Sequence, residues 1–399
     1  MDDESIDTVR NVLFIMVDRL RWDYLSCYGH PTLSTPNIDW LARHGVRFEN
    51  AYVQGPLCGS SRMSYYAGRY AASHGVVRDS VAPSATRKRL GAYLRLHDIR
   101  SSVIGKANIV PDGRALHRPE IYPASSEGLL SAQLGFESYE RDDDALTWGK
   151  RHACLFSEVK DGRWETAWMT DRALDFIDEQ GDRPWCLHLS YTALRRLHEA
   201  PAACHDTHTA DDVVPARRHP DELKNSHPVQ RGLQGCAGGK GISKDDVRGQ
   251  AVSAYMSQIK RLDDHLGRLL DVLADTGRLE DTMVIFCSDH GDYQGDHYPR
   301  EKELFYDAVT RVPLIVYDPR ESADARRGTV ETRLVEAIDI VPTVLDAYGL
   351  DDDGHVLEGR SLQPLLHGRD TDWRAAVFSE MGYAWHDFAR DPSTSVDRP

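Results

Sequence analysis

Two continuous apolar runs are the strongest structural signals along the chain. Residues 11–17 read Asn-Val-Leu-Phe-Ile-Met-Val, and residues 282–288 read Thr-Met-Val-Ile-Phe-Cys-Ser. Uninterrupted runs with several β-branched side chains predict strands that are buried on both faces, as in a parallel sheet covered by helices. Both runs stop at an acidic residue, Asp18 after the first and Asp289 after the second.

Helix and strand patterns alternate around these two runs. Thr35 and Pro36 supply the N-cap and the first residue of one helix, and Gly45 ends it. Further helices are predicted near 87–97, near 166–180 and at about 246–275, and further strands at 46–53, near 101–105 and at 184–191. Helices that alternate with buried strands predict a doubly wound α/β fold, with a mostly parallel sheet flanked by helices.

One interval breaks this alternation. Residues 202–245 are polar and rich in His, Gly and Pro, and the interval is too long for an ordinary connection. It is therefore predicted to be either a functional loop or a disordered segment.

Composition narrows the class of protein. The chain has 399 residues, 41% of them hydrophobic, which is enough for a large buried core, and its formal net charge of −15 argues against nucleic acid as a partner. No window approaches the run of about 18 apolar residues that a membrane span needs, and the N-terminus is acidic. The seven cysteines are irregularly spaced without a C-x-x-C pair, which fits a reducing compartment. We therefore expect a soluble, cytoplasmic protein with no membrane partner.

Polar residues that follow buried strands are the first candidates for a site, because ligands bind at the carboxyl ends of strands in open α/β sheets. Asp18, Asp289 and His290 would supply two carboxylates and an imidazole, a set that suits a divalent cation. The alternative is that each aspartate only caps a helix or shapes a turn, which is the commoner role at such positions.

A second candidate surrounds Cys58. Gly55 and Pro56 form a turn, and the serine-rich stretch after them can begin a helix, which would place Cys58 at a positive helix N-terminus. Arg62, one turn on, adds a planar cation that fits tetrahedral oxyanions. The pair describes an anion-binding nucleophile, and the alternative is an ordinary buried cysteine in a turn.

Together these residues resemble the sulfatase family. The segment Cys58-x-x-x-Arg62, with Gly68-Arg69 after it, is similar to the sulfatase signature, and Asp18, Ser288-Asp289-His290-Gly291 and Lys302 stand in the family's order. His290, Met63-Ser64-Tyr65-Tyr66 and Glu301-Lys302-Glu303-Leu304-Phe305 resemble the branch of phosphonate monoester hydrolases and arylsulfatases. The resemblance implies an alkaline-phosphatase-like fold.

The resemblance also implies a role for each site residue. Cys58 would be oxidised to formylglycine by the formylglycine-generating enzyme, and Asp18, Asp289, His290 and residue 58 would bind one divalent metal ion, Mn or Ca. Arg62, Lys106 and Lys302 would hold the non-bridging oxygens of the substrate, and His198 or Lys302 would donate a proton to the leaving group. Family members usually end in a small antiparallel subdomain, so we expect a catalytic domain at 1–372, with 202–245 inserted, and a truncated remnant of that subdomain at 373–399.

The implied function is metal-dependent hydrolysis of small sulfate esters, as in arylsulfatases, and of phosphonate monoesters or phosphodiesters. Three departures from the family pattern, Arg19, Ser60 and the short C-terminus, support an alternative: a degraded, non-catalytic member that binds oxyanions or a protein partner. A third reading is a phosphatase or mutase relative with a different nucleophile. The sequence leaves a homo-oligomer open.

Overall fold

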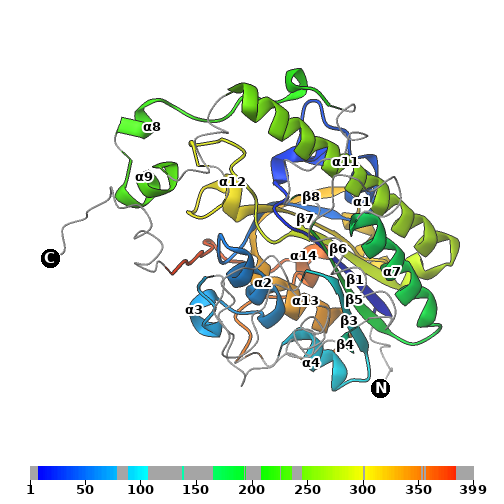
Figure 1. The fold of residues 1–399 in the computed structure, drawn as a ribbon. Coiled ribbons are helices and arrows are strands. Elements are labelled where there is room, and N and C mark those ends of the chain that lie inside the picture. Colours follow the sequence, from blue (N-terminus) through cyan, green and yellow to red (C-terminus); the bar gives the residue numbers. More distant parts are fainter. Residues whose placement is uncertain are drawn as a thin grey trace.

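A computed structural model describes most of the chain. The described residues are 8–78, 89–106, 137–138, 165–192, 194, 208–224, 226–235, 245–299, 302–351, 354 and 356–382. They form helices on both faces of one mixed sheet (Figure 1).

The sheet has eight strands in the order β4-β3-β5-β1-β6-β7-β2-β8. The strands are β1 (Asn11–Val17), β2 (Val46–Tyr52), β3 (Arg100–Gly105), β4 (Glu137–Ser138), β5 (Trp185–Tyr191), β6 (Thr282–Ser288), β7 (Arg311–Tyr317) and β8 (Thr329–Glu336). Strand β7 runs antiparallel to both of its neighbours, and the other pairs are parallel. Every residue of β1, β5 and β6 is buried, as the apolar runs of β1 and β6 predicted. The predicted α/β class is confirmed.

Helices cover both faces of this sheet. They are α1 (Pro36–His44), α2 (Cys58–Ala67), α3 (Ala71–His74), α4 (Leu90–Arg95), α7 (Glu165–Glu179), α8 (Asp221–Lys224), α9 (Pro228–Gly235), α11 (Asp245–Asp275), α12 (Asp307–Thr310), α13 (Ile340–Ala347) and α14 (Gln363–Leu366). Helices α1, α7 and α11 pack on one face, and α2, α4, α13 and α14 pack on the other (Figure 1). The alternating side chains of the strands therefore supply two separate apolar cores.

The interval 202–245 contains regular elements where the structure describes it. Residues 208–235 contain a 3-10 turn at Ala210–Asp212 and the helices α8 and α9, and α8 lies near the loop after β6 because His297 Nδ1 and Glu222 Oε2 are 3.0 Å apart. Residues 202–207 and 236–244 lie outside the described part of the chain. The described residues of the interval therefore include two short helices, and the choice between a functional loop and a disordered segment stays a prediction.

Residues 373–382 follow the edge of the sheet. The Trp373 indole donates to the carbonyl of Leu334 in β8 (2.7 Å), and the Glu380 N–H donates to the carbonyl of Gln54 (2.9 Å), just before the Cys58 turn. The segment therefore packs against the part of the chain that leads into α2. The division at residue 372 stays a prediction. Among the described residues, no helix has the length and apolar content that a membrane crossing requires.

Candidate active site

The two aspartates that end the apolar runs lie side by side. Strands β1 and β6 are parallel neighbours with Val17 opposite Ser288, so Asp18 and Asp289 leave the same edge of the sheet at the same level. Both carboxylates are 0% exposed. The main-chain N–H groups of Arg19 (3.0 Å) and His290 (2.9 Å) donate to Asp289 Oδ1, which fixes that carboxylate.

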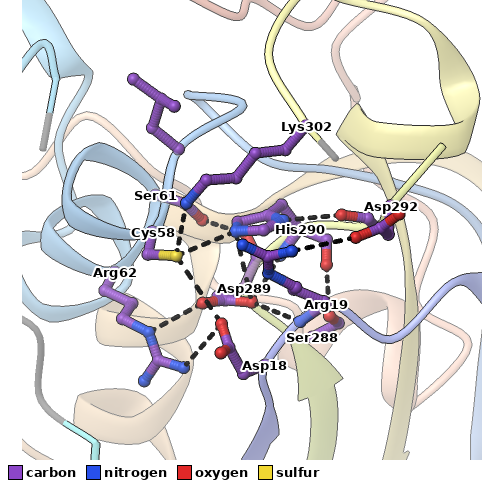
Figure 2. Close-up of polar contacts among 12 residues, drawn as sticks. Asp18, Arg19, Cys58, Ser61, Arg62, Ser288, Asp289, His290, Asp292 and Lys302 are labelled. Carbon is purple, nitrogen blue, oxygen red and sulfur yellow. Dashed lines mark hydrogen bonds and ion pairs between the residues drawn. The ribbon is translucent and has the colours of Figure 1, made fainter. Parts of the chain in front are cut away.

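Cys58 is the first residue of α2, as predicted, and it faces these two aspartates (Figure 2). Its Sγ lies 3.6 Å from Asp18 Oδ1 and 3.1 Å from His290 Nε2. The turn before it requires glycine at position 55, because a Cβ there would lie 2.1 Å from Ser60 Oγ. The helix N-terminus adds a positive field at residue 58, which favours an anionic group there.

His290 presents an unprotonated nitrogen to Cys58 when its ring is neutral. Its Nδ1 lies 2.6 Å from the carbonyl oxygen of Gly291, which can only accept a hydrogen bond, so Nδ1 carries the proton. Nε2 is then left with a lone pair that points at residue 58. A backbone partner on the second ring nitrogen is typical of histidines that bind metals, because it fixes the tautomer.

Arg62 lies beneath the site and is enclosed by protein groups. Its Nε donates to Asp289 Oδ2 (2.8 Å), and its Nη1 donates to the Lys106 carbonyl and to Ser190 Oγ, each at 2.6 Å. The side chain is 0% exposed. Arg62 therefore ties α2 to the tips of β3, β5 and β6.

Two lysines approach the site. Lys106 Nζ lies 2.8 Å from Asp18 Oδ1, and Lys302 Nζ lies 2.7 Å from Cys58 Sγ. Burial alone raises the pKa of the Cys58 thiol, but Lys106 and Lys302 outweigh it and lower that pKa to about 7. Burial also raises the pKa of Asp18, yet the charges of Lys106 and Arg62 hold it well below its ordinary value. The site thus favours negative charge on both residues.

The residues present fit a divalent cation. Asp18, Cys58, Asp289 and His290 are buried, and each offers one ligand atom within 4.8 Å of the others. Asp18 Oδ2 is buried without a hydrogen-bond partner among the described residues, which is costly for a carboxylate unless a further positive group meets it. Oxygen ligands with one imidazole nitrogen suit Ca or Mn.

Arg19 follows Asp18 directly, but its charge is directed to another carboxylate. Its Nη1 lies 3.2 Å from Asp292 Oδ2, and the Asp292 side chain is 1% exposed. The Arg19 backbone has φ 64, an uncommon conformation for a residue other than glycine. From the sequence, Arg19 is expected to point outward or towards the substrate; the structure pairs it with Asp292 beside the candidate metal ligands (Figure 2).

The structure brings together most of the residues that sequence analysis selected. Asp18, Cys58, Arg62, Lys106, Asp289, His290 and Lys302 all meet at this site. His198 lies outside the described residues. Sequence analysis missed Ser190 and Asp292, which hold Arg62 and Arg19. Ser190 could have been found as a polar residue near the end of a buried strand.

Sequence comparison relates the chain to sulfatases and related hydrolases. The sulfatase family model matches residues 10–350. The chain is 30% identical to the multifunctional alkaline phosphatase superfamily protein PehA of Trinickia caryophylli, over 94% of this chain and 81% of that protein. It is 29% identical to an arylsulfatase of Clostridium perfringens, over 96% of this chain and 82% of that protein.

Two solved structures of phosphonate monoester hydrolases resemble this fold. The phosphonate monoester hydrolase of Agrobacterium radiobacter superposes with a TM-score of 0.80 at 26% identity, covering 94% of this chain and 80% of that one. The phosphonate monoester hydrolase SpPMH of Silicibacter pomeroyi gives a TM-score of 0.78 at 25% identity, over 93% and 79% of the two chains.

Proposed function

The chain belongs to the sulfatase family and is a sulfuric ester hydrolase by that membership, and from this premise we propose that it cleaves sulfate esters and phosphonate monoesters or phosphodiesters through a formylglycine made from Cys58. One observation carries the proposal: the side chain of residue 58 lies at a helix N-terminus, between Lys302 and the buried group of Asp18 and His290.

The metal and the modification would each supply one kind of chemistry. Asp18, Asp289, His290 and residue 58 would hold a divalent cation, Mn or Ca, which supplies Lewis acidity at residue 58 when bound. The aldehyde of formylglycine, once hydrated, supplies one hydroxyl that attacks sulfur or phosphorus and a second that later expels sulfate or the phosphorus acid. A thiol or serine at this position lacks the second hydroxyl.

The protein's own cations would bind the group that is transferred. Lys302 Nζ lies 2.7 Å from Cys58 Sγ, the position that a hydroxyl of the hydrated aldehyde would take after conversion, so it is placed to contact non-bridging oxygens or the leaving oxygen during in-line attack. Lys106, on the other side of Asp18, adds a second positive charge. Both lysines would stabilise the negative charge that builds up in the transition state. His198, the other proton donor suggested by the resemblance, stays a prediction.

Arg62 would act differently from the substrate contact that the resemblance implied. Three of its hydrogen bonds go to Asp289, the Lys106 backbone and Ser190, and its side chain has no exposed surface. We assign it a positioning role: it holds the Asp289 carboxylate, the Lys106 carbonyl and the Ser190 hydroxyl, while the lysines contact the substrate.

The proposal is tested by the chemical state of residue 58 together with turnover. In protein made in a host that has the formylglycine-generating enzyme, mass spectrometry should find the aldehyde or its hydrate on the Cys58 peptide, and the protein should hydrolyse an aryl sulfate and a phenylphosphonate ester. Cys58→Ala should abolish both activities. Detection of thiol alone, or activity retained in Cys58→Ala, would remove this mechanism; thiol without turnover would support the non-catalytic alternative, and retained activity would support another nucleophile.

A further inference from the structure

Lys302, which contacts residue 58, is followed by two residues in an unfavourable backbone conformation that neighbouring groups must stabilise. The two residues after it, Glu303 and Leu304, have φ values of 82 and 58. Residues other than glycine rarely adopt this left-handed region, and two in succession are strained. Such a conformation persists only where neighbouring groups fix it, so the contacts of Glu303 decide where the Lys302 side chain starts.

Both backbone groups of Glu303 are fixed by hydrogen bonds. Its N–H donates to the carbonyl of Pro56 (3.3 Å), two residues before Cys58, and its carbonyl accepts from the hydroxyl of Tyr293 (2.7 Å). The first bond is long, whereas the second is short and comes from a side chain that is 0% exposed. The Tyr293 hydroxyl is therefore the stronger of the two contacts that set the Lys302 backbone.

Tyr293 is itself rigidly held. Its ring packs with Ala308 and Val309, and it meets the ring of Tyr306 edge-on with centroids 6.0 Å apart. Its main-chain carbonyl accepts from Arg21 Nη1 (2.9 Å). The position of its hydroxyl is thus defined from both the ring and the backbone.

The ring cluster is also held from the polar interval. His297 stacks on Tyr306 with centroids 4.0 Å apart, and its Nδ1 lies 3.0 Å from Glu222 Oε2 in α8. A chain of contacts therefore runs from α8 through His297, Tyr306 and Tyr293 to the carbonyl of Glu303. These contacts connect α8, within the interval 202–245, to the backbone beside Lys302.

We propose that Tyr293 is a positioning residue for Lys302: its hydroxyl fixes the strained turn at Glu303 and so sets the Lys302 ammonium against residue 58. The inference rests on the proposed function, because it takes Lys302 as a group that contacts the transferred oxyanion. Removal of the hydroxyl should let the turn relax and move the ammonium, and a displacement of about 1 Å can cost on the order of 100-fold in rate.

The test compares two tyrosines of the same cluster. Tyr293→Phe removes the hydroxyl that bonds Glu303 and keeps the ring, whereas Tyr306→Phe makes the same change on the neighbouring ring and serves as the matched control. We expect Tyr293→Phe to lower kcat/KM for an aryl sulfate by roughly 10- to 100-fold, mainly through kcat. Tyr306→Phe should stay within about twofold of the natural protein, and both variants should keep its melting temperature to within a few degrees.

A double-mutant cycle with Lys302→Ala separates positioning from general stability. If Tyr293 acts through Lys302, then Tyr293→Phe should change neither kcat/KM nor the affinity for inorganic sulfate, measured by calorimetry, once Lys302 is absent. An equal loss in both backgrounds, or no loss in Tyr293→Phe alone, would overturn the inference. Failure of the proposed function would look different, since the natural protein would then hydrolyse no ester while the sulfate-binding cycle could still be measured.

Discussion

A cation beside a candidate metal ligand needs a compensating charge, and Arg19 has one in Asp292. The pair is nearly buried, with 12% of the Arg19 side chain and 1% of the Asp292 side chain exposed. An opposite charge at 3.2 Å offsets the repulsion that Arg19 would exert on a bound cation. Arg19 still lowers the pKa of Asp18, after the larger effects of burial, Lys106 and Arg62, so its field reaches the site.

This field leads to a prediction about substrate choice. A phosphonate monoester and an aryl sulfate each carry one negative charge, but the phosphonate concentrates it on two non-bridging oxygens and the sulfate spreads it over three, so an additional cation should favour the phosphorus substrate. Arg19→Ala should lower the ratio of kcat/KM for a phenylphosphonate ester to that for an aryl sulfate by roughly tenfold, which corresponds to about 1.4 kcal/mol. Steady-state assays with both substrates measure this ratio. Arg19→Lys keeps the charge and serves as the control, and an unchanged ratio in Arg19→Ala would contradict the prediction.

At the level of secondary-structure elements, sequence patterns located the strands that carry the site and missed β4 and β8 at the two edges of the sheet and β7 inside it. Strands β1 and β6 are buried on both faces, so their sequences are continuous apolar runs that identify them unambiguously. Strand β8 is partly exposed and mixes Glu331 and Arg333 with apolar residues, and β7 contains Pro313, so neither pattern stands out. Edge strands and short helices such as α8 depend on tertiary contacts that a local pattern does not contain.

The junction of α2 and α3 contains a buried histidine that should make stability depend on pH. His74 Nδ1 accepts from the Val76 N–H (3.1 Å), so its Nε2 carries the proton and donates to Ser64 Oγ in α2 (3.0 Å). Burial, with added repulsion from Arg69 and Arg89, lowers the pKa of His74 to about 3. A second proton would need Nδ1 and would break the bond to Val76.

Because the folded pKa lies below the unfolded value of about 6.5, the unfolded chain binds a proton first as pH falls. The contribution of His74 is therefore complete above about pH 6.5 and is lost as pH falls towards 3, by up to about 1.4 kcal/mol per pH unit. Denaturant unfolding between about pH 4 and 6 measures how the free energy of unfolding changes with pH. His74→Gln should reduce that slope by the amount that corresponds to uptake of about one proton on unfolding. Ser64→Ala removes the hydrogen-bond partner without removing the titrating group, so it should lower stability and keep the slope. An unchanged slope in His74→Gln would refute the assignment.

For the whole molecule, the site exists only because segments far apart in sequence meet at one edge of the sheet. Cys58 contacts Asp18, His290 and Lys302 across separations of 40, 232 and 244 residues. The placement of polar residues after buried strands predicted that Asp18 and His290 lie together, and the family resemblance brought Cys58, Lys106 and Lys302 to the same site. Neither supplied Asp292 or Tyr293, because their roles depend on hydrogen bonds within and between loops whose conformations no periodic pattern encodes.

The buried carboxylates of Asp18 and Asp289 lie close together at the candidate metal site. We therefore predict that a bound cation stabilises the folded protein as a whole. The unfolded chain cannot assemble ligands from β1, α2 and β6, so binding to the folded state alone raises its stability, by about 2.7 kcal/mol at a free ion concentration about 100 times Kd. Addition of Mn or Ca to chelator-treated protein should raise the melting temperature in scanning calorimetry, and Asp18→Asn should weaken that response. Asp318→Asn is the matched control, because this buried carboxylate follows antiparallel β7 at the opposite end of the sheet, where Tyr317 pairs with Val284. Asp318→Asn should lower the melting temperature but keep the rise in melting temperature that Mn or Ca causes. If Asp18→Asn shows the same rise as the natural protein, the cation binds elsewhere.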